Sequence, residues 1–309
     1  MKRDTMRLAL AALALSVAVS CANQEAMRAP EAPLAETPKT FTAYSRMLAR
    51  QVTFNLDVLF PPGDGPFPVI ILMHGCAGIA PGAQTIPSWR SFFLDNGYAT
   101  VALESNLARG WPRDICQRAE ESSTTAQLDR TAEAYAAARI LRRLPSIRKD
   151  GIIVMGFSHG GGAALYLASN MAPKYWSRIG YQHAVEPINA VISHYPWCGR
   201  TENPIRFSNQ PVTAPTLLQI GALDAWTPVE YCRALYEARG PRSNGRLELR
   251  VFEGAHHSFD NGAPVREGIG CGGPNGACGI PVRSGHNEDA FQQSRRNVAA
   301  FLSKHFGVR

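Results

Sequence analysis

The sequence contains no cysteine pair in C-x-x-C spacing, and none of its histidines stands at ligand spacing beside a cysteine. Structural zinc sites need such pairs, so we expect no metal site. The sequence also has no basic stripe interleaved with aromatic residues, although its formal net charge is +7. Nucleic-acid binding is therefore not expected, because phosphate contacts require clustered Lys and Arg side chains.

The N-terminus has too short an apolar run to span a membrane. Residues 8–19 are apolar and follow a basic start, whereas a spanning helix needs about 20 residues. This pattern predicts a signal peptide over residues 1–20 and hence an exported protein of the cell envelope or periplasm. Ala18-Val19-Ser20 before Cys21 resembles a bacterial lipobox, which would leave Cys21 lipidated as a membrane anchor; soluble export is the alternative.

Internal repeats and a second domain are also absent. Residues 22–40 are rich in Pro, Ala and Glu, and we expect residues 21–45 to form a disordered tether. Residues 46–309 predict one α/β domain, because strands alternate with helices, which favours a mostly parallel sheet. The expected strands are 51–60, 68–73, 98–103, 151–157, 188–194, 216–220 and 247–252; the helices are 89–96, 122–144, 229–239 and 287–306; residues 261–285 are expected to be a loop.

A G-x-S-x-G pentad, Gly156 to Gly160, follows the strand that begins at Gly151. Small residues and helix formers come after it. A serine on a sharp strand-to-helix turn needs neighbours without bulk, and the turn lifts its hydroxyl above the sheet. The helix N-terminus then points free N–H groups at the same place. We therefore expect Ser158 to be a nucleophile.

A base and an orienting acid follow at the ends of later strands. Asp224 comes just past the 216–220 strand, and His256 and His257 come past the 247–252 strand. The order Ser, Asp, His is that of α/β-hydrolases, and the carboxyl ends of parallel strands meet at one edge. The sequence alone leaves open which histidine is the base; we select His257.

Two backbone donors are expected to bind the oxyanion. One is the N–H of His159, directly after the nucleophile, and the other is the N–H of Cys76, in the loop after the 68–73 strand. His74, in the same loop, is expected to brace the turn and not to act in catalysis. No metal or organic cofactor is implied.

Several segments together resemble the dienelactone hydrolase family. They are Met73 to Gly78, Glu104-Ser105 with Arg109-Gly110, Gly156 to Gly161, Tyr195 to Cys198, Gly221 to Pro228 and Gly254 to Asp260. The resemblance implies an α/β-hydrolase fold from about residue 50 to the C-terminus. It also supports His257, because Ser258-Phe259 follow it as a small residue and Phe follow the family's histidine. The chain departs from the best-known members, which have Cys where Ser158 stands, and it has Glu104 where relatives often have Asp.

We therefore expect a serine hydrolase that cleaves small carboxylic esters or lactones through an acyl-enzyme. A catalytically silent envelope-binding protein and a peptidase are the alternatives, although no extra gating domain is present for a peptidase. Loops after the strands predict a pocket with apolar walls from Trp111, Trp197 and Trp226 and with Arg109 available to a substrate carboxylate. Lid packing and surface ion pairs are the alternative roles for these side chains. The oligomeric state is not predicted.

Six cysteines follow Cys21, an even number that suggests three disulfides in an exported chain. Cys271 and Cys278 flank a short Gly-rich loop and are expected to pair. Cys76 and Cys116 lie in loops after neighbouring strands, and the remaining pair is Cys198 with Cys232. A bridge at Cys76 would hold the predicted oxyanion loop in place.

Overall fold

The computed structural model describes residues 32–169, 171–181, 185–199, 211–271 and 278–307. The predicted signal peptide, Cys21 and residues 22–31 of the predicted tether lie outside these residues. The chain divides into two units, Met1–Leu34 and Ala35–Arg309, and all the elements below belong to the second. In the part of the chain that is described, no helix is long and apolar enough to cross a membrane.

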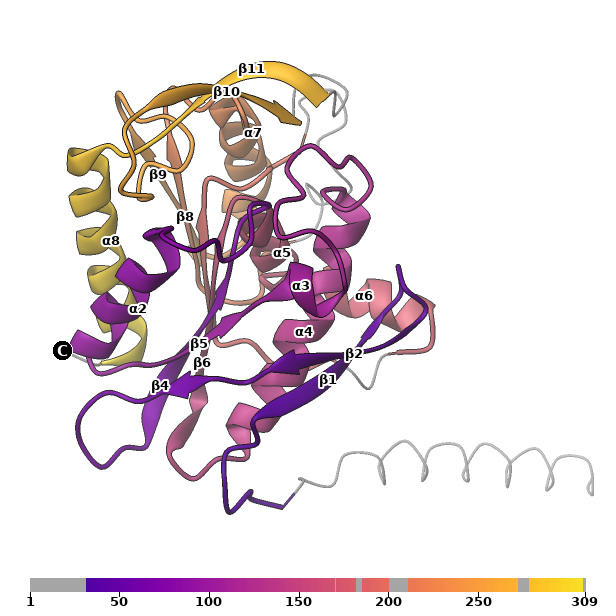
Figure 1. The fold of residues 1–309 in the computed structure, drawn as a ribbon. Helices are drawn as coiled ribbons and strands as arrows, with labels where there is room; N and C mark the ends of the chain where they lie inside the picture. The colour runs from indigo at the N-terminus through magenta and orange to yellow at the C-terminus, as the bar shows by residue number, and fades with distance from the viewer. Residues whose placement is uncertain (1–31, 170, 182–184, 200–210, 272–277, 308–309) are drawn as a thin grey trace, which may run out of the picture. The chain divides into compact units, whose positions relative to one another are not determined.

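A seven-stranded sheet runs through the second unit in the order β3-β5-β4-β6-β7-β8-β9 (Figure 1). Strand β3 is antiparallel to β5, and all other neighbours are parallel. The predicted α/β-hydrolase fold with a mostly parallel sheet is thus confirmed. The strands are β3 (Val58–Leu59), β4 (Phe67–Met73), β5 (Ala99–Leu103), β6 (Ile147–Phe157), β7 (Ala190–His194), β8 (Thr216–Gly221) and β9 (Leu247–Phe252).

The sheet centre is apolar on both faces. Residues 69–73 of β4 and 152–155 of β6 are fully buried and lie in parallel register, Val69 opposite Ile152 and Leu72 opposite Met155. Continuous apolar runs of this kind are typical of parallel strands, which helices cover on both sides. The central position of β6 places the residues that follow it at the middle of the sheet edge.

Helices cover both faces of the sheet. Figure 1 shows α2 and α8 on one side and α4, α5 and α6 on the other. Helix α4 begins after Ser123, whose side chain accepts a hydrogen bond from the Ala126 N–H, and α8 begins after Asn287, which accepts from the Ala290 N–H. Both caps satisfy N–H groups that a helix start leaves free. The helices are α2 (Thr85–Asp95), α3 (Ser105–Ala108), α4 (Thr124–Arg142), α5 (His159–Leu167), α6 (Met171–Arg178), α7 (Val229–Arg239) and α8 (Glu288–Phe306).

The predicted tether ends earlier than residue 45. Strand β1 (Thr40–Ser45) pairs in antiparallel register with β2 (Arg50–Asn55), so the folded domain includes it. Phe41 and Ala43 are buried while the alternate residues Thr40 and Thr42 are exposed. This period of two is typical of a strand. The Pro and Glu residues just before it led us to extend the predicted tether over these residues.

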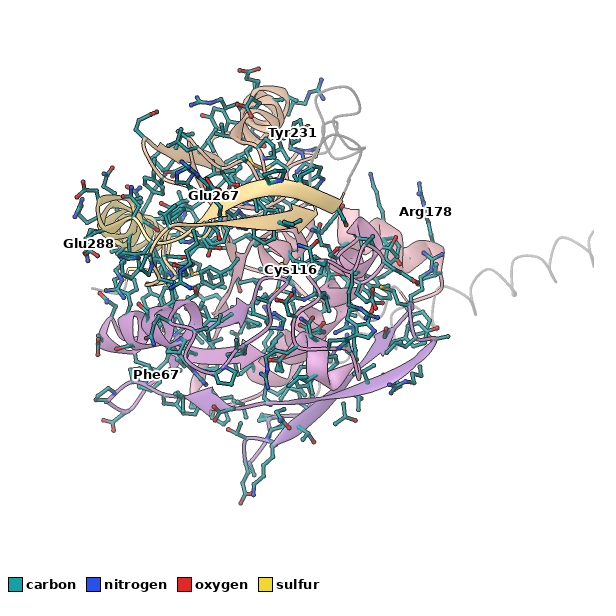
Figure 2. All side chains as sticks on the ribbon, turned by 45° about the horizontal axis from the view of Figure 1, so that its top comes forward. Phe67, Cys116, Arg178, Tyr231, Glu267 and Glu288 are labelled. Carbon is teal, nitrogen blue, oxygen red and sulfur yellow. A yellow bond between two sulfur atoms is a disulfide. The ribbon has the colours of Figure 1, made fainter. Side chains whose placement is uncertain are left out.

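The predicted loop over residues 261–285 contains a β-hairpin. Strands β10 (Arg266–Cys271) and β11 (Cys278–Ser284) pair with each other, and Figure 2 shows this hairpin, with Glu267, in front of the loop that carries Cys116. The Gln117 side chain donates to the Ile269 carbonyl, which joins the two segments. Glycines at 268 and 270 give β10 no apolar alternation, so only pairing with β11 makes it a strand.

Candidate active site

Ser158 lies on the sharp turn between β6 and α5. Its backbone has φ +50°, a left-handed conformation that costs energy for a residue with a Cβ. A Cβ at Gly156 would lie 2.1 Å from the Gly160 carbonyl oxygen, and one at Gly160 would lie 2.2 Å from the Met73 carbonyl oxygen. The turn can therefore form only with glycine at both positions of the pentad.

His257 connects Ser158 to Asp224. Its Nε2 atom is 2.9 Å from Ser158 Oγ, and its Nδ1 atom is 2.8 Å from Asp224 Oδ2. All three side chains are buried, although they come from the ends of β6, β8 and β9. A carboxylate on Nδ1 favours the tautomer with the proton there, which leaves Nε2 free to accept the serine proton.

The Asp224 carboxylate is held by the turn that follows it. Its Oδ1 accepts from the N–H groups of Trp226, at 3.0 Å, and Thr227, at 2.8 Å, and its Oδ2 also accepts from Thr227 Oγ1 at 2.9 Å. The Trp226 ring lies 5.0 Å from the His257 ring, centroid to centroid. The Asp224 carboxylate is thus fixed in direction, and the Trp226 indole covers one side of the His257 ring.

His256 points away from Ser158. Its ring is half-buried, and its Nδ1 is 3.1 Å from the Leu223 carbonyl oxygen. The structure therefore brings together Ser158, Asp224 and His257, and it leaves His256 outside this group.

The two predicted oxyanion donors come from two elements, the Cys76 N–H from the loop after β4 and the His159 N–H from α5. The loop passes close to Ser158, because a Cβ on Gly75 would lie 4.0 Å from Ser158 Oγ. His159 is the first residue of α5, where an N–H has no partner within the helix. The Cys76 carbonyl accepts from the Ile115 N–H at 3.0 Å and from Asn106 Nδ2 at 3.1 Å. These contacts fix the Cys76–Ala77 peptide, and the Gly75–Cys76 peptide, which carries the Cys76 N–H, is held by the Gly78 N–H donating to the Gly75 carbonyl at 3.2 Å. No hydrogen bond from the Cys76 or His159 N–H is found within the described residues.

Disulfides join two of the predicted pairs, Cys76–Cys116 and Cys198–Cys232. These pairings are confirmed. The first bridge ties the loop after β4 to the loop before α4. The third predicted pair involves Cys271, whose side chain lies outside the described residues, and it stays a prediction.

His74 braces the loop after β4. Its Nδ1 is 2.6 Å from the Gly75 carbonyl oxygen, and its Nε2 accepts from the Ser105 N–H at 2.9 Å. Burial, and next the charge of Arg130, lower the pKa of His74, so the ring is neutral at pH 7. This placement agrees with the bracing role expected from the sequence.

A cavity of about 210 Å³ opens beside Ser158. Its walls come mainly from the loop after β4 and the start of α2, with apolar side chains such as Ile79, Ile86 and Phe157. No Asp, Glu, Lys or Arg is among the described residues that line it. The lining residues are His74, Gly75, Ala77, Gly78, Ile79, Ala80, Ala83, Thr85, Ile86, Pro87, Phe157, Ser158, Tyr195, Ser258 and Asn261.

The expected role of Arg109 in binding a substrate carboxylate is wrong. Its guanidinium is buried and pairs with Asp129, at 3.1 Å, and with Glu133. The guanidinium therefore already has two carboxylate partners within the protein, and Arg109 is not among the residues that line the cavity. Trp111 stacks on the same guanidinium, with 5.4 Å from Cζ to the ring centroid, and does not line the cavity either.

The two other predicted tryptophans also lie outside the cavity wall. Trp197 packs edge-on against Tyr231 of α7, at 5.2 Å between ring centroids. Trp226 contacts His257, as described above, and its indole fills the space where a Cβ on Gly270 of the hairpin would be. The residues that do form the wall, in the loop 77–87, have no charged or aromatic signature, and nothing in their sequence distinguishes them from an ordinary loop.

A family model described as "Dienelactone hydrolase family" matches residues 57–306. No curated protein matches the chain. Solved structures match over nearly the whole fold. They include the propionate-bound esterase 2 of the planctomycete Thermogutta terrifontis, at 18% identity and TM-score 0.57, covering 88% of this chain and 97% of that one. A dienelactone hydrolase-like promiscuous phosphotriesterase from metagenomic libraries matches at 18% identity and TM-score 0.56, covering 86% of this chain and 98% of that one.

Proposed function

The chain belongs to the dienelactone hydrolase family, and from this we propose that it is a serine hydrolase that cleaves small carboxylic esters through an acyl-enzyme on Ser158. The observation that carries the proposal is the chain of contacts from Ser158 Oγ to His257 Nε2, at 2.9 Å, and from His257 Nδ1 to Asp224 Oδ2, at 2.8 Å. A serine hydroxyl is a weak nucleophile until a base takes its proton, and this geometry supplies the base and its orienting acid.

The acylation step follows from these positions. Ser158 Oγ attacks the ester carbonyl carbon while His257 Nε2 takes the hydroxyl proton. The carbonyl oxygen becomes an oxyanion, which the N–H groups of Cys76 and His159 stabilise. The C–O bond to the alcohol then breaks, and His257 gives its proton to the leaving alkoxide. Asp224 stabilises the imidazolium throughout.

Deacylation repeats these roles with water. His257 takes a proton from a water molecule, whose oxygen attacks the acyl carbon. The ester bond to Ser158 breaks, and the proton returns to the serine oxygen. The net reaction is ester plus water to acid plus alcohol, and none of its steps requires a metal or organic cofactor.

The cavity supports a short, uncharged acyl group. Its apolar walls carry no ionised side chain, and the one phenol there, Tyr195, donates its hydroxyl proton to Asp260 at 2.6 Å, away from the cavity. A carboxylate placed here would lose its hydration without gaining a partner. The solved structure of a family-like esterase with bound propionate is in line with a short acyl group. A lactone is an internal ester and stays within the same chemistry.

Two measurements test the function. A fluorophosphonate probe should label the wild type on Ser158, and a panel of p-nitrophenyl esters of graded chain length, with a lactone and a peptide amide, should show turnover of the short esters. A folded protein that takes no label and hydrolyses none of the panel would be the silent envelope-binding protein. Turnover of the amide in preference to the esters would identify a peptidase.

We also propose that the protein is exported. The two disulfides, one between loops and one between a loop and α7, support an oxidising compartment. Lipidation of Cys21 and cleavage before it remain part of this proposal. Mass spectrometry of the mature protein should find a lipidated Cys21 at the N-terminus; an unmodified N-terminus downstream of Cys21 would leave soluble export.

A further inference from the structure

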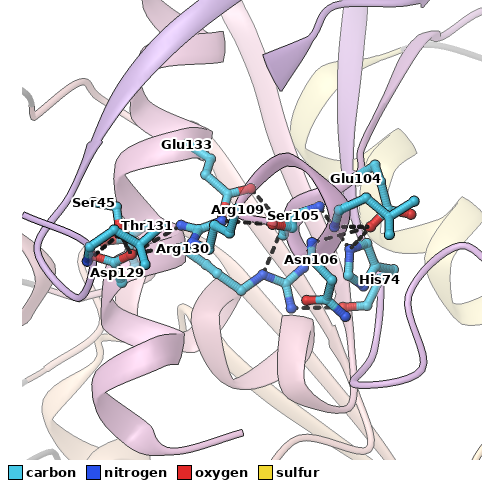
Figure 3. Close-up of polar contacts among 12 residues, drawn as sticks. Ser45, His74, Glu104, Ser105, Asn106, Arg109, Asp129, Arg130, Thr131 and Glu133 are labelled. Carbon is cyan, nitrogen blue, oxygen red and sulfur yellow. Dashed lines mark hydrogen bonds and ion pairs between the residues drawn. The ribbon is translucent and has the colours of Figure 1, made fainter. Parts of the chain in front are cut away.

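Arg130 of α4 lies completely buried beneath the site. Its Nη1 atom donates to the His74 carbonyl oxygen at 2.9 Å and is also 2.9 Å from His159 Nδ1. One guanidinium nitrogen therefore contacts both the loop after β4 and the first residue of α5. Figure 3 shows the Arg130 side chain lying between Ser105 and His74.

These two contacts stand next to the two proposed oxyanion donors. His159 itself supplies one N–H, and His74 lies two residues before Cys76, which supplies the other. The loop and the helix belong to different βα units, and Arg130 comes from a third segment of chain. The β4–β6 ladder ends at Met73 and Gly156, so the guanidinium bridges the two segments just beyond the last paired residues.

Further hydrogen bonds fix the guanidinium itself. Arg130 Nε donates to Ser105 Oγ at 3.0 Å, and Ser105 Oγ donates to Glu133 Oε2 at 2.6 Å. Glu133 also pairs with Arg109. The planar fork of an arginine can hold contacts in several directions at once, which a lysine ammonium on a flexible stem does less well.

The protonation states agree with this arrangement. Burial, and next the charge of Arg130, lower the pKa of His159 well below its usual value, so its ring is neutral and Nδ1 can accept a hydrogen bond. Burial also lowers the pKa of Arg130, to about 10, which leaves the guanidinium charged at neutral pH. A cation therefore contacts the residue that carries one proposed donor, His159, and the carbonyl of His74, two residues before the other.

We propose that Arg130 is a positioning residue of the oxyanion hole. It holds the Cys76 and His159 amides at one spacing and places a fixed positive charge beneath them. This inference rests on the proposed function. Because negative charge develops only in the transition state, Arg130 should act on kcat and much less on substrate binding.

Arg130→Met and Arg130→Lys test this role. Losing one oxyanion donor lowers kcat by about 10²- to 10³-fold. In Arg130→Met both donor N–H groups remain, but the guanidinium contacts to His74 and His159 are gone. We expect Arg130→Met to lower kcat by about 10- to 100-fold with KM changed less than about 3-fold. Arg130→Lys, which keeps the charge but not the fork, should recover part of the loss.

Arg142→Met is the matched control. Arg142 is also on α4, is partly buried and bonds to Glu186 and to the carbonyls of Lys149 and Pro187, far from Ser158 along the helix. It should keep wild-type kcat even if its melting temperature falls. A folded Arg130→Met or Arg130→Lys variant that keeps wild-type kcat would overturn the inference. If Arg130→Met does not fold, the kcat of Arg130→Lys decides.

A double-mutant cycle separates positioning from general damage. If Arg130 acts through the His159 side chain, His159→Phe should also lower kcat, and the double variant Arg130→Met/His159→Phe should be scarcely worse than Arg130→Met alone. Fully additive losses would overturn the inference. A wild type that takes no fluorophosphonate label and turns over no ester would instead contradict the proposed function. Failure of the proposed function can thus be told apart from failure of the Arg130 inference.

Discussion

Ser158 has the most direct test at the scale of single residues. Replacing it with alanine removes the nucleophile but leaves the glycines that shape the turn, so the fold should remain. We expect Ser158→Ala to lower kcat by about 10⁴-fold or more, because only binding and oxyanion stabilisation are left. Steady-state kinetics with a short p-nitrophenyl ester, alongside circular dichroism, checks this. Retention of more than about a tenth of wild-type kcat would disprove the assignment.

The two adjacent histidines provide a second comparison at this scale. His257 contacts both Ser158 and Asp224, whereas His256 contacts the Leu223 carbonyl. His257→Ala should therefore lower kcat by about 10⁴-fold, and His256→Ala should change kcat by less than about tenfold. The two variants differ by one position in the same loop, so each controls for the other. The reverse ranking of kcat would move the role of base to His256.

The loop after β4 is the element on which the site depends most. The Cys76–Cys116 bridge spans 40 residues, and Cys198–Cys232 spans 34. Removing either with a double Cys→Ser change should cost about 2–4 kcal/mol of stability. Because the Cys76 amide is a proposed oxyanion donor, only the Cys76→Ser/Cys116→Ser variant should also lose kcat, by about tenfold. Equal kcat losses in both variants would contradict a specific role for the first bridge.

Glu104 holds the same loop and gives a pH dependence. Its Oε2 accepts from the Ile79 N–H at 3.1 Å. Burial opposes its charge, but the Ile79 and Leu107 N–H groups that donate to it lower the pKa of Glu104 from 4.5. A lowered folded-state pKa adds stability above the unfolded pKa, and that stability is lost as pH falls from the unfolded pKa through the lower folded one.

Urea unfolding of the wild type and Glu104→Gln measures this effect. The wild type should be the more stable at pH 6, and the difference should fall by more than half at pH 3, since the carboxyl of the unfolded chain is then protonated. Glu237→Gln, which removes an exposed carboxylate of α7 for which no ion pair is found within the described residues, should show a much smaller trend. A difference between wild type and Glu104→Gln that stays constant from pH 6 to pH 3 would contradict the assigned pKa.

At the scale of the whole molecule, the size and polarity of the cavity beside Ser158 set the expected substrate range. The cavity beside Ser158 is small and apolar, and Arg109 is already paired with Asp129 and Glu133. We expect kcat/KM to fall from acetyl and butyryl esters to octanoyl and longer ones, and neutral esters to exceed anionic analogues. Ile79→Ala, which enlarges the wall, should shift the optimum toward longer chains. A preference of the wild type for long acyl chains would refute this pocket.

The sequence by itself determined the fold class and the turn that carries Ser158. Both depend on local rules: apolar β-branched runs between helices, and glycines at 156 and 160 where a Cβ would clash with the backbone. The meeting of Ser158, Asp224 and His257 also followed, because each comes after a strand and parallel strands bring their carboxyl ends to one edge. Two disulfide pairings came from the expected positions of their cysteines, after strands for Cys76, Cys116 and Cys198 and in a helix for Cys232.

Only the tertiary structure decided which partners the side chains meet. Arg109 was predicted to face substrate, but Asp129 and Glu133 of α4 lie nearer and neutralise it inside the protein. Strand β10 lacks an apolar alternation and is a strand only through its pairing with β11. Arg130 carries no motif at all, and its place beneath the site depends on how α4 packs against the loop after β4 and the start of α5. Contacts between segments distant in sequence depend on packing and leave no periodic trace in a single chain, which is why these features required the fold.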